Sequence, residues 1–389
     1  MTLPQLSPAV GATITWLTEG ARSASRPQDV LQQLCNQLAA AGLAIHRAAV
    51  FVSTLHPNVM ARRFLWIPDG DVQVDEASYD LQESEIYRRS PVPVVMRTGR
   101  AIRLHLDAEN CPDDYNIVDD FRKAGFTDYI IHPLDFLNGE HHAISWTTRK
   151  AGGFSDADIA ALLAVRAPLA RIAEIYALRR TAGNLLDTYV GHRSGERILE
   201  GKIRRGDVDT IHAAILAADL RDFTVTSNRR SAKDVVGILN TYYDCLVPSI
   251  EAHGGEILKF IGDGLLAIFS GEQDQQLVCD AALDAAEDGQ RRLREQQSDV
   301  LRCGMALHIG DVLYGNIGST DRLDFTAIGP AVNLTARLEP LTRELDRPIV
   351  TSAAFAGACS LSLERLGAFP LRGFDGTTEV FAPREQGAV

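Results

Sequence analysis

Two aspartates stand at the ends of predicted strands in the C-terminal half of the chain. Asp219 closes the apolar stretch IHAAILAADL, and Asp263 lies at the glycine-lined tip of GGEILKFIGDGLLAIF, which predicts two strands joined by a turn. In a β-α-β-β arrangement the first strand lies beside that hairpin, so we expect both carboxylates at one edge of the sheet. A single turn aspartate usually hydrogen-bonds to the backbone. Two placed together instead suit Mg²⁺ ions that bind substrate phosphates.

The flanking segments predict the elements that position these acids. Residues 231–255 indicate a helix capped by Ser231, and residues 276–297 indicate a second helix. We interpret residues 302–318 as strand, turn and strand, and residues 329–345 as a helix with proline at its first position. The resulting order β-α-β-β-α-β is the ferredoxin-like arrangement. The predicted fold class is therefore α/β (α+β).

The N-terminal part predicts a separate mixed α/β unit. An amphipathic helix is indicated at residues 27–43, and strands are indicated at residues 47–55 and 61–68. An Asn-Gly pair between alternating apolar runs predicts a hairpin over residues 126–148.

A long helical segment follows this unit and predicts a connector between two domains. It opens with a capping box of Ser155 and Asp158, and it contains an internal proline, which predicts a kink. Its exposed apolar stripe suggests pairing with another copy of the chain. A plain core helix of the first domain is the alternative.

The length, composition and net charge of the chain restrict the classes of protein to which it can belong. The 389 residues are 46% hydrophobic and 23% charged, which fits a soluble two-domain protein. The net charge of −12 argues against nucleic-acid and anionic-membrane partners, which need a basic surface. No stretch approaches the roughly 18 apolar residues of a membrane helix, and no signal sequence is evident, so we expect a cytoplasmic protein. The cysteines are scattered, and we expect buried thiols in a reducing cytosol. They are Cys35, Cys111, Cys245, Cys279, Cys303 and Cys359.

Four segments of the second domain together resemble a known family. ILAADLRDFT, GGEILKFIGDGLLAIF, ALHIGDVLYGNIGS and FTAIGPAVNLTARLE resemble the class III nucleotidyl cyclases, which make cyclic AMP or cyclic GMP. The resemblance covers about residues 211–382 and is specific, because four motifs occur in the right order. We therefore expect a sensor domain at residues 1–155, a helical connector or signalling helix at 156–207, and a cyclase catalytic domain at 208–385.

The resemblance implies roles for the acids and for one helix. Asp219 and Asp263 are similar to the family's metal-binding aspartates, and the Leu220 carbonyl is similar to its backbone ligand, for two Mg²⁺ or Mn²⁺ ions per site. Asn333 and Arg337 resemble the pair that orients the ribose and stabilises the transition state. Independently, these two residues are spaced i and i+4, so they share one helix face. In this family two chains pack head to tail as a homodimer, and each active site takes its metal aspartates from one chain and its other groups from the partner.

A further arginine is assigned by resemblance, and Arg337 has a structural alternative. Arg372, in PLRGF, resembles the basic residue that holds the terminal phosphates. The alternative for Arg337 is a surface ion pair with Glu339 or Asp346.

Lys259 and Thr326 resemble the family's two base-recognition positions. Adenine presents an acceptor at N1 and a donor at its amino group, which suits a lysine that donates and a threonine hydroxyl that accepts. Guanine presents the opposite pattern and requires an acid at the first position. The pair therefore predicts ATP as the substrate. In the family this pair marks a bacterial branch that resembles soluble, bicarbonate-responsive adenylyl cyclases, so activation by bicarbonate is a hypothesis.

Two positions depart from the family pattern. Asp222, in LRDFT, stands where the family most often has glycine, and we expect it either to shift metal affinity or to lie exposed in the turn. Asp311 stands in a predicted turn where some relatives have a basic residue, which argues against a phosphate contact from that loop.

The first domain resembles a GAF-type sensor. HPLDFLNGEHHAISWTT and GGFSDADIAALL carry this resemblance, with a six-stranded-sheet pattern and a terminal helix that leads to the output domain. His132, His141 and His142 lie near its hairpin. A metal or haem site is one interpretation, and turn and surface histidines are the favoured one. The sequence does not identify the ligand, and we expect the connector to transmit a rearrangement to the active sites.

Three other functions fit the residues less well. A guanylate cyclase is disfavoured by Lys259 and Thr326, and a degenerate nucleotide-binding protein is disfavoured by the complete set of site side chains. A GG(D/E)EF synthase needs an acidic tip, whereas Glu256 is followed by Ile257 and leads into a strand. The sequence thus predicts an adenylate cyclase that converts ATP to 3′,5′-cyclic AMP and pyrophosphate. The reaction is a two-metal, in-line attack of the ribose 3′-hydroxyl on the α-phosphate.

Overall fold

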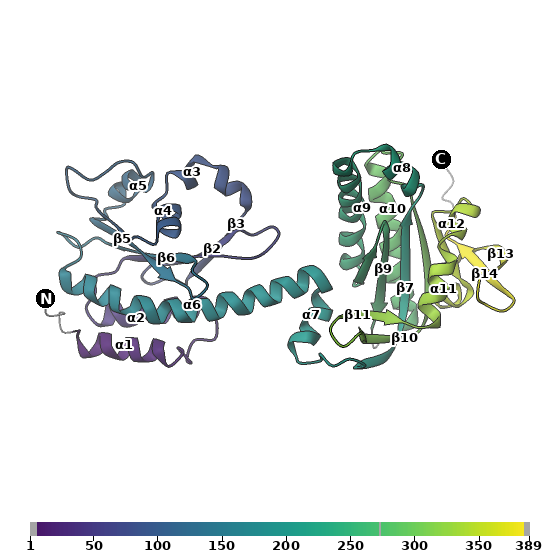
Figure 1. Cartoon of the computed structure of the whole chain (residues 1–389), viewed down its shortest axis with the longest axis horizontal. Coiled ribbons are helices and arrows are strands. Elements are labelled where there is room, and N and C mark those ends of the chain that lie inside the picture. The colour runs from purple at the N-terminus through teal and green to yellow at the C-terminus, as the bar shows by residue number, and fades with distance from the viewer. Residues whose placement is uncertain (1–5, 272–273, 385–389) are drawn as a thin grey trace. The chain divides into compact units, whose positions relative to one another are not determined.

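The structure is a computed structural model that describes residues 6–271 and 274–384. The chain forms two compact units, residues 1–185 and 186–389, each with its own sheet (Figure 1). Helix α6 (Asp156–Val190) begins in the first unit and ends in the second. The expected outer limits of the domains, residues 1 and 385, lie outside the described residues.

The first unit is built on a six-stranded sheet with the order β3-β2-β1-β6-β5-β4. Every neighbouring pair is antiparallel. The strands are β1 (Arg47–Ser53), β2 (Ala61–Trp66), β3 (Gln73–Ala77), β4 (Ile102–His105), β5 (Asp128–Asp135) and β6 (His141–Thr148). The predicted hairpin is confirmed as β5–β6, and Gly139 adopts a φ of +86° in its turn, a conformation that glycine accepts without strain.

Helices cover both faces of this sheet (Figure 1). Helices α1 (Pro8–Thr18), α2 (Pro27–Ala40) and α6 pack on one face. Helices α4 (Pro91–Thr98) and α5 (Ile117–Lys123) pack on the other. The short elements η1 (Tyr79–Glu83) and α3 (Glu85–Arg88) precede α4.

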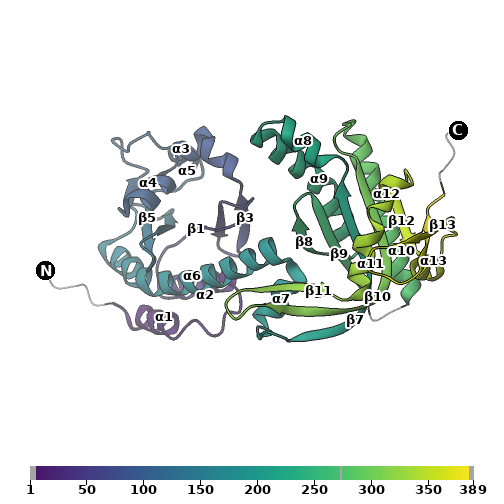
Figure 2. The same ribbon diagram turned by 45° about the vertical axis from the view of Figure 1, so that its right-hand side comes forward.

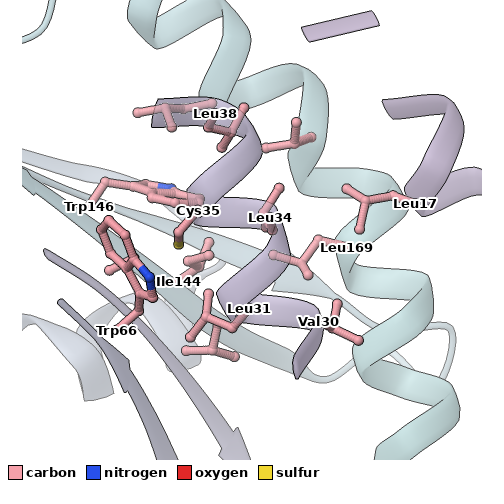
Figure 3. Packing of buried hydrophobic residues seen from close by; sticks show 14 of the residues in the cluster. Leu17, Val30, Leu31, Leu34, Cys35, Leu38, Trp66, Ile144, Trp146 and Leu169 are labelled. Carbon is pink, nitrogen blue, oxygen red and sulfur yellow. The ribbon is translucent and has the colours of Figure 1, made fainter. Parts of the chain in front are cut away.

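The main core of the first unit lies between α2 and the sheet (Figure 3). Leu34, Cys35 and Leu38 on α2 are fully buried, and they pack in one cluster with Trp66 and Trp146 from the strands. The predicted amphipathic helix is therefore confirmed, because its apolar positions form one stripe that faces the sheet.

The histidines of the hairpin are not the turn and surface residues that we expected. His132 and His142 are buried, at 3% and 2% exposure, because helices cover both faces of the sheet and nearly every residue of β5 and β6 is buried. Burial lowers the pKa of His132 to about 4. Only His141 is partly exposed, and its Nδ1 lies 2.8 Å from Oδ1 of Asp135. The expectation was wrong because the hairpin turn is confined to residues 136–140.

Helix α6 is 35 residues long and continues through its internal proline. The predicted capping box is confirmed: the Ser155 backbone N–H donates to Asp158 Oδ2 at 2.9 Å, and the Asp158 N–H donates to Ser155 Oγ at 3.2 Å. The expectation of an exposed apolar stripe is wrong for most of its residues: Leu162, Leu169 and Ile172 are at most 5% exposed and belong to the core of the first unit, as in the alternative of a plain core helix. Exposed apolar side chains lie further along the helix, at Ile175, Leu178, Leu185 and Tyr189. Neither α6 nor any other helix in the described ranges has the length and apolar character needed to cross a membrane.

The second unit is built on an eight-stranded sheet with the order β13-β14-β12-β10-β7-β9-β8, and β11 pairs with β10. The strands are β7 (Val208–Leu220), β8 (Glu256–Ile261), β9 (Gly264–Ser270), β10 (Cys303–Gly318), β11 (Leu323–Ile328), β12 (Ile349–Ser352), β13 (Glu364–Pro370) and β14 (Thr377–Ala382). Helices α9 (Ala232–Ala252) and α10 (Gln275–Glu295) pack on one face. The remaining helices are α7 (His192–Leu199), α8 (Phe223–Arg229), α11 (Pro330–Leu338), α12 (Leu341–Glu344) and α13 (Ala353–Ala358). The predicted β-α-β-β-α-β order is confirmed as β7-α9-β8-β9-α10-β10.

The prediction of strand, turn and strand for residues 302–318 is wrong. β10 is one continuous strand that runs beside β7 along nearly all of its length (Figure 2). Gly310, where we expected the turn, is a packing position: a Cβ there would lie 3.0 Å from the Cβ of Ala331 on α11. The glycine therefore allows a helix to approach the strand closely. Asp311 is consequently a strand residue, and its Oδ1 lies 2.6 Å from Nδ1 of His212.

The helix predicted over residues 329–345 is two helices. Pro330 opens α11 as expected, but α11 ends before Pro340 and α12 begins after it. Proline lacks the backbone N–H that a continuous helix requires, and its ring clashes with the preceding turn.

Candidate active site

Asp219 and Asp263 lie together at one edge of the sheet, as the strand pattern predicts. Asp219 is the penultimate residue of β7 and stands opposite Gly264, the first residue of β9. Asp263 occupies the turn just before Gly264. A Cβ on Gly264 would lie 3.3 Å from Oδ1 of Asp219, so the glycine leaves room for the carboxylate.

The acids at this edge repel one another. Burial and the neighbouring Asp263 raise the pKa of Asp219 from 3.8 to about 6. Glu339, which follows α11, is a third nearby acid: burial and then Asp219 raise its pKa to about 7. A cation relieves such a concentration of negative charge. Sequence reasoning missed Glu339, because only the packing of α11 brings it to this edge.

The turn that carries Asp263 is held from α9. The hydroxyl of Tyr243 donates to the carbonyl of Gly262 at 2.8 Å, and the Tyr243 ring lies 4.3 Å from that of Phe260. The hairpin tip is thus fixed by a helix as well as by strand pairing. Sequence reasoning placed Tyr243 only as a helix residue.

Lys259 contacts β11, the strand that carries Thr326, through Asp324. Nζ of Lys259 on β8 lies 3.4 Å from Oδ2 of Asp324 on β11. Thr326 follows two residues later, so it lies on the same side of β11 as Asp324. The Thr326 hydroxyl is buried and has no hydrogen-bond partner within the described part of the chain. A buried hydroxyl without a partner costs stability, so this position is suited to a ligand atom.

Asn333 and Arg337 are exposed on α11, and neither is brought into contact with Asp219 or Asp263. The alternative ion pair of Arg337 is absent from the residues that the structure describes, since Asp346 pairs instead with Arg221 at 3.2 Å.

Three further residues that the sequence analysis singled out are Arg372, Leu220 and Asp222. Arg372 is exposed in the connection between β13 and β14. The Leu220 side chain is buried and has no atom that could bind a metal, so only its backbone carbonyl is a candidate ligand. Asp222 adopts a φ of +59°, which explains the family's preference for glycine at this position. Its exposed carboxylate accepts a hydrogen bond from Arg343 at 2.5 Å, so the expectation of an exposed turn residue is confirmed.

Comparison with known proteins identifies the class of this unit. Residues 208–382 match the family described as adenylate and guanylate cyclase catalytic domain. The terminal-differentiation-specific adenylate cyclase of Dictyostelium discoideum is 34% identical over 178 residues, which cover 44% of this chain and 8% of that protein. The adenylate cyclase of Anabaena cylindrica is 34% identical over 149 residues, which cover 36% of this chain and 30% of that protein. The crystal structure of the guanylyl cyclase Cya2 is similar over 46% of this chain and 96% of its own, with 30% identity and a TM-score of 0.41.

The second unit therefore contains a class III adenylate/guanylate cyclase catalytic domain. All the residues that the sequence assigned to the site lie within the matched range. The chain spans less than a third of the length of either curated relative named above.

Proposed function

We propose that the protein is an adenylate cyclase that converts ATP to 3′,5′-cyclic AMP and pyrophosphate. The observation that carries the proposal is the combination, in a cyclase catalytic domain, of two strand-end aspartates with a Lys–Thr pair whose buried threonine hydroxyl has no partner among the described residues. The aspartates suit metal binding, and the Lys–Thr pair suits adenine.

Asp219 and Asp263 fit divalent metal ions. Their mutual repulsion, which contributes to the raised pKa of Asp219, is relieved by a cation. Within residues 6–271 and 274–384 no group of three His, Cys, Asp or Glu side chains could hold a metal. Mg²⁺ or Mn²⁺ here would therefore take the two aspartates, with the Leu220 carbonyl, water and substrate phosphate as further ligands. When bound, two such ions neutralise phosphate charge and activate the 3′-hydroxyl.

Asn333, Arg337 and Arg372 provide the remaining polar groups. Asn333 and Arg337 are four residues apart on α11, so an amide reaches the ribose and a guanidinium reaches the α-phosphate from one helix face. Negative charge develops on the phosphate oxygens during in-line attack, and an arginine placed there is worth several kcal/mol. Arg372 holds the terminal phosphates, for which an exposed, permanently charged and planar guanidinium is suited.

Lys259 and Thr326 determine the choice of base. Lys259 donates to adenine N1, and the Thr326 hydroxyl accepts from the adenine amino group. The Asp324 carboxylate lies 3.4 Å from Nζ of Lys259, and it keeps this ammonium group beside β11.

We infer that a second copy of the chain completes each site. Asn333 and Arg337 are exposed and do not contact the metal aspartates of their own chain. Beside Asp263, the apolar side chains of Phe260 and Ile261 are 53% and 59% exposed, which suits burial at a protein interface. A head-to-tail homodimer with two shared sites accounts for both features.

We also propose that the first unit is a GAF-like sensor. The six-stranded antiparallel sheet with helices on both faces supports this, as does α6, which leads out of the unit. Activation by bicarbonate is a separate hypothesis that rests on the Lys259–Thr326 resemblance.

The charge reversal Lys259→Glu tests base recognition. It replaces the donor for adenine N1 by an acceptor that suits guanine, and a mismatched buried polar pair costs about 1–3 kcal/mol. We therefore expect kcat/KM for ATP to fall roughly 10- to 100-fold and the ratio of cyclic AMP to cyclic GMP formed to fall with it. Initial rates with ATP and with GTP, with products resolved by chromatography, measure both quantities.

Lys150→Glu is the matched control. Lys150 also pairs with an aspartate, Asp158, at 3.4 Å, but both residues belong to the first unit. Its ATP to GTP preference is expected to equal that of the wild type. An unchanged preference in Lys259→Glu as well would contradict the assignment of Lys259 to the base.

A further inference from the structure

A carboxylate that the proposed chemistry does not use is buried at the start of β8. Glu256 is 7% exposed, and it lies between Ser194 on α7 and Tyr314 on β10. Ser194 Oγ donates to Glu256 Oε1 at 2.6 Å, and the Tyr314 hydroxyl lies 2.9 Å from both Glu256 carboxylate oxygens. A carboxylate is costly to bury unless strong hydrogen bonds hold it. These convergent hydrogen bonds therefore fix Glu256 in one position.

Helix α7 is docked on the sheet at further points. Gly191 precedes α7 with a φ of +88°, and a Cβ there would lie 3.4 Å from the Ile257 carbonyl oxygen on β8. Arg197 on α7 donates to Asp209 on β7 at 2.8 Å, and its guanidinium lies 5.1 Å from the centre of the Tyr314 ring. α7 thus contacts β7, β8 and β10, and all of these elements belong to the second unit.

Strand β8 leads from this docking point to the residue proposed to bind the base. Lys259 follows Glu256 by three residues, and a β-bulge lies between Ile257 and Lys259. A bulge re-aims the side chains that follow it, and a one-residue slip of a strand turns every side chain to the other face. The position of Lys259 therefore depends on how the strand is anchored just before the bulge.

The turn that carries Asp263 has a separate anchor. The Tyr243 hydroxyl on α9 donates to the Gly262 carbonyl, and β9 pairs with β7 from Gly264 onwards. A substitution that weakens the anchoring of Glu256 is thus expected to displace Lys259 more than it displaces Asp219 or Asp263.

We propose that Glu256 is a positioning residue for nucleotide binding. The Ser194–Glu256–Tyr314 network ties α7 to β8 and sets where Lys259 meets the base. The proposal rests on the proposed cyclase function, because that function gives Lys259 its role. α7 directly follows α6 in the chain. Because the network ties α7 to β8, a movement of α7 would be transmitted to β8.

Ser194→Ala tests the proposal, with Ser249→Ala as a matched control. Both serines are fully buried and donate to a carboxylate in the second unit, Ser194 to Glu256 at 2.6 Å and Ser249 to Asp288 at 2.7 Å. In the full chain we expect Ser194→Ala to raise KM for ATP roughly fivefold with kcat changed less than about twofold. Both substitutions are expected to lower the melting temperature by similar amounts. Ser249→Ala is expected to leave KM for ATP unchanged.

A conservative variant separates positioning from folding. Glu256→Gln keeps the shape of the side chain and one acceptor oxygen, so its KM for ATP is expected to lie close to the wild-type value. Tyr314→Phe removes a donor to Glu256, so it is expected to raise KM for ATP as Ser194→Ala does. A KM that is unchanged in Ser194→Ala, or raised equally in Ser249→Ala, would overturn the proposal.

Equilibrium binding keeps this test independent of the cyclase reaction. If the wild type binds ATP with Mg²⁺ but forms no cyclic nucleotide, the proposed function fails. A weaker ATP affinity in Ser194→Ala than in Ser249→Ala then still supports the network, and equal affinities overturn it.

Discussion

The substitution Asp219→Asn is expected to abolish cyclase activity and, without metal, to make the protein more stable. Asparagine keeps the size of the side chain but removes the charge that a metal ion requires. Metal ions contribute several kcal/mol to stabilisation of the transition state, and each 1.36 kcal/mol is a factor of ten in rate. The loss of activity is therefore expected to reach about a thousandfold.

The gain in stability follows from the pKa of Asp219. Burial and Asp263 raise this pKa from 3.8 to about 6, so the folded protein binds the proton more tightly than the unfolded chain does. The stabilising effect of the proton is complete below about pH 4 and is lost as the pH rises through about 6. At higher pH the charged carboxylate destabilises the fold. Because Asp219 is only half-buried, solvent screening leaves about 1–2 kcal/mol of this effect.

Thermal unfolding with a chelator, between about pH 4 and pH 8, measures the effect. The melting temperature of Asp219→Asn is expected to exceed that of the wild type by about 3–6 °C at pH 8 and to approach it near pH 4. Asp222→Asn is the matched control, because Asp222 is three residues away but is exposed and pairs with Arg343. It is expected to keep its activity and to gain no stability. Full activity in Asp219→Asn would be inconsistent with a metal role for this residue.

A mixture of Asp263→Ala and Arg337→Ala is expected to recover activity that neither variant has alone. If each site takes its metal acids from one chain and its arginine from the other, the heterodimer contains one site with both defects and one intact site. With free exchange of subunits, half of the dimers are heterodimers and half of their sites are intact. The mixture is therefore expected to show about a quarter of wild-type activity.

The control for this experiment mixes Asp219→Ala with Asp263→Ala. Both changes affect the same half-site, so every site in every dimer lacks one metal ligand, and no recovery is expected. The proposal of a shared site would be wrong if the first mixture stayed inactive while size-exclusion chromatography showed that heterodimers had formed.

The edge that carries the two aspartates was predictable because strand patterns are local and pairing follows from topology. Asp219 ends an apolar run, Asp263 sits between two glycines, and β-α-β-β connectivity leaves one way to bring these strands together. That Asn333 and Arg337 share one face of α11 was predictable for a similar reason, since helical periodicity places residues four apart side by side.

The features that the sequence did not reveal depend on contacts between distant segments. Gly310 is typical of a turn, yet it lies within a strand because α11 packs against it. Glu339 lies beside Asp219 only because α11 ends there, and Glu256 is buried only because α7 docks on β8. His132 was misplaced because the interior of the first unit extends to the end of β5. In each case the tertiary packing overrides the local pattern.

The central claim is that this chain makes cyclic AMP from ATP. The most direct test incubates the purified wild-type protein with Mg²⁺ or Mn²⁺ and either ATP or GTP, and resolves the products by chromatography. We predict cyclic AMP and pyrophosphate from ATP, with much less cyclic GMP from GTP. Cyclic GMP as the main product, or no cyclic nucleotide from either substrate in the folded dimer, would contradict the account.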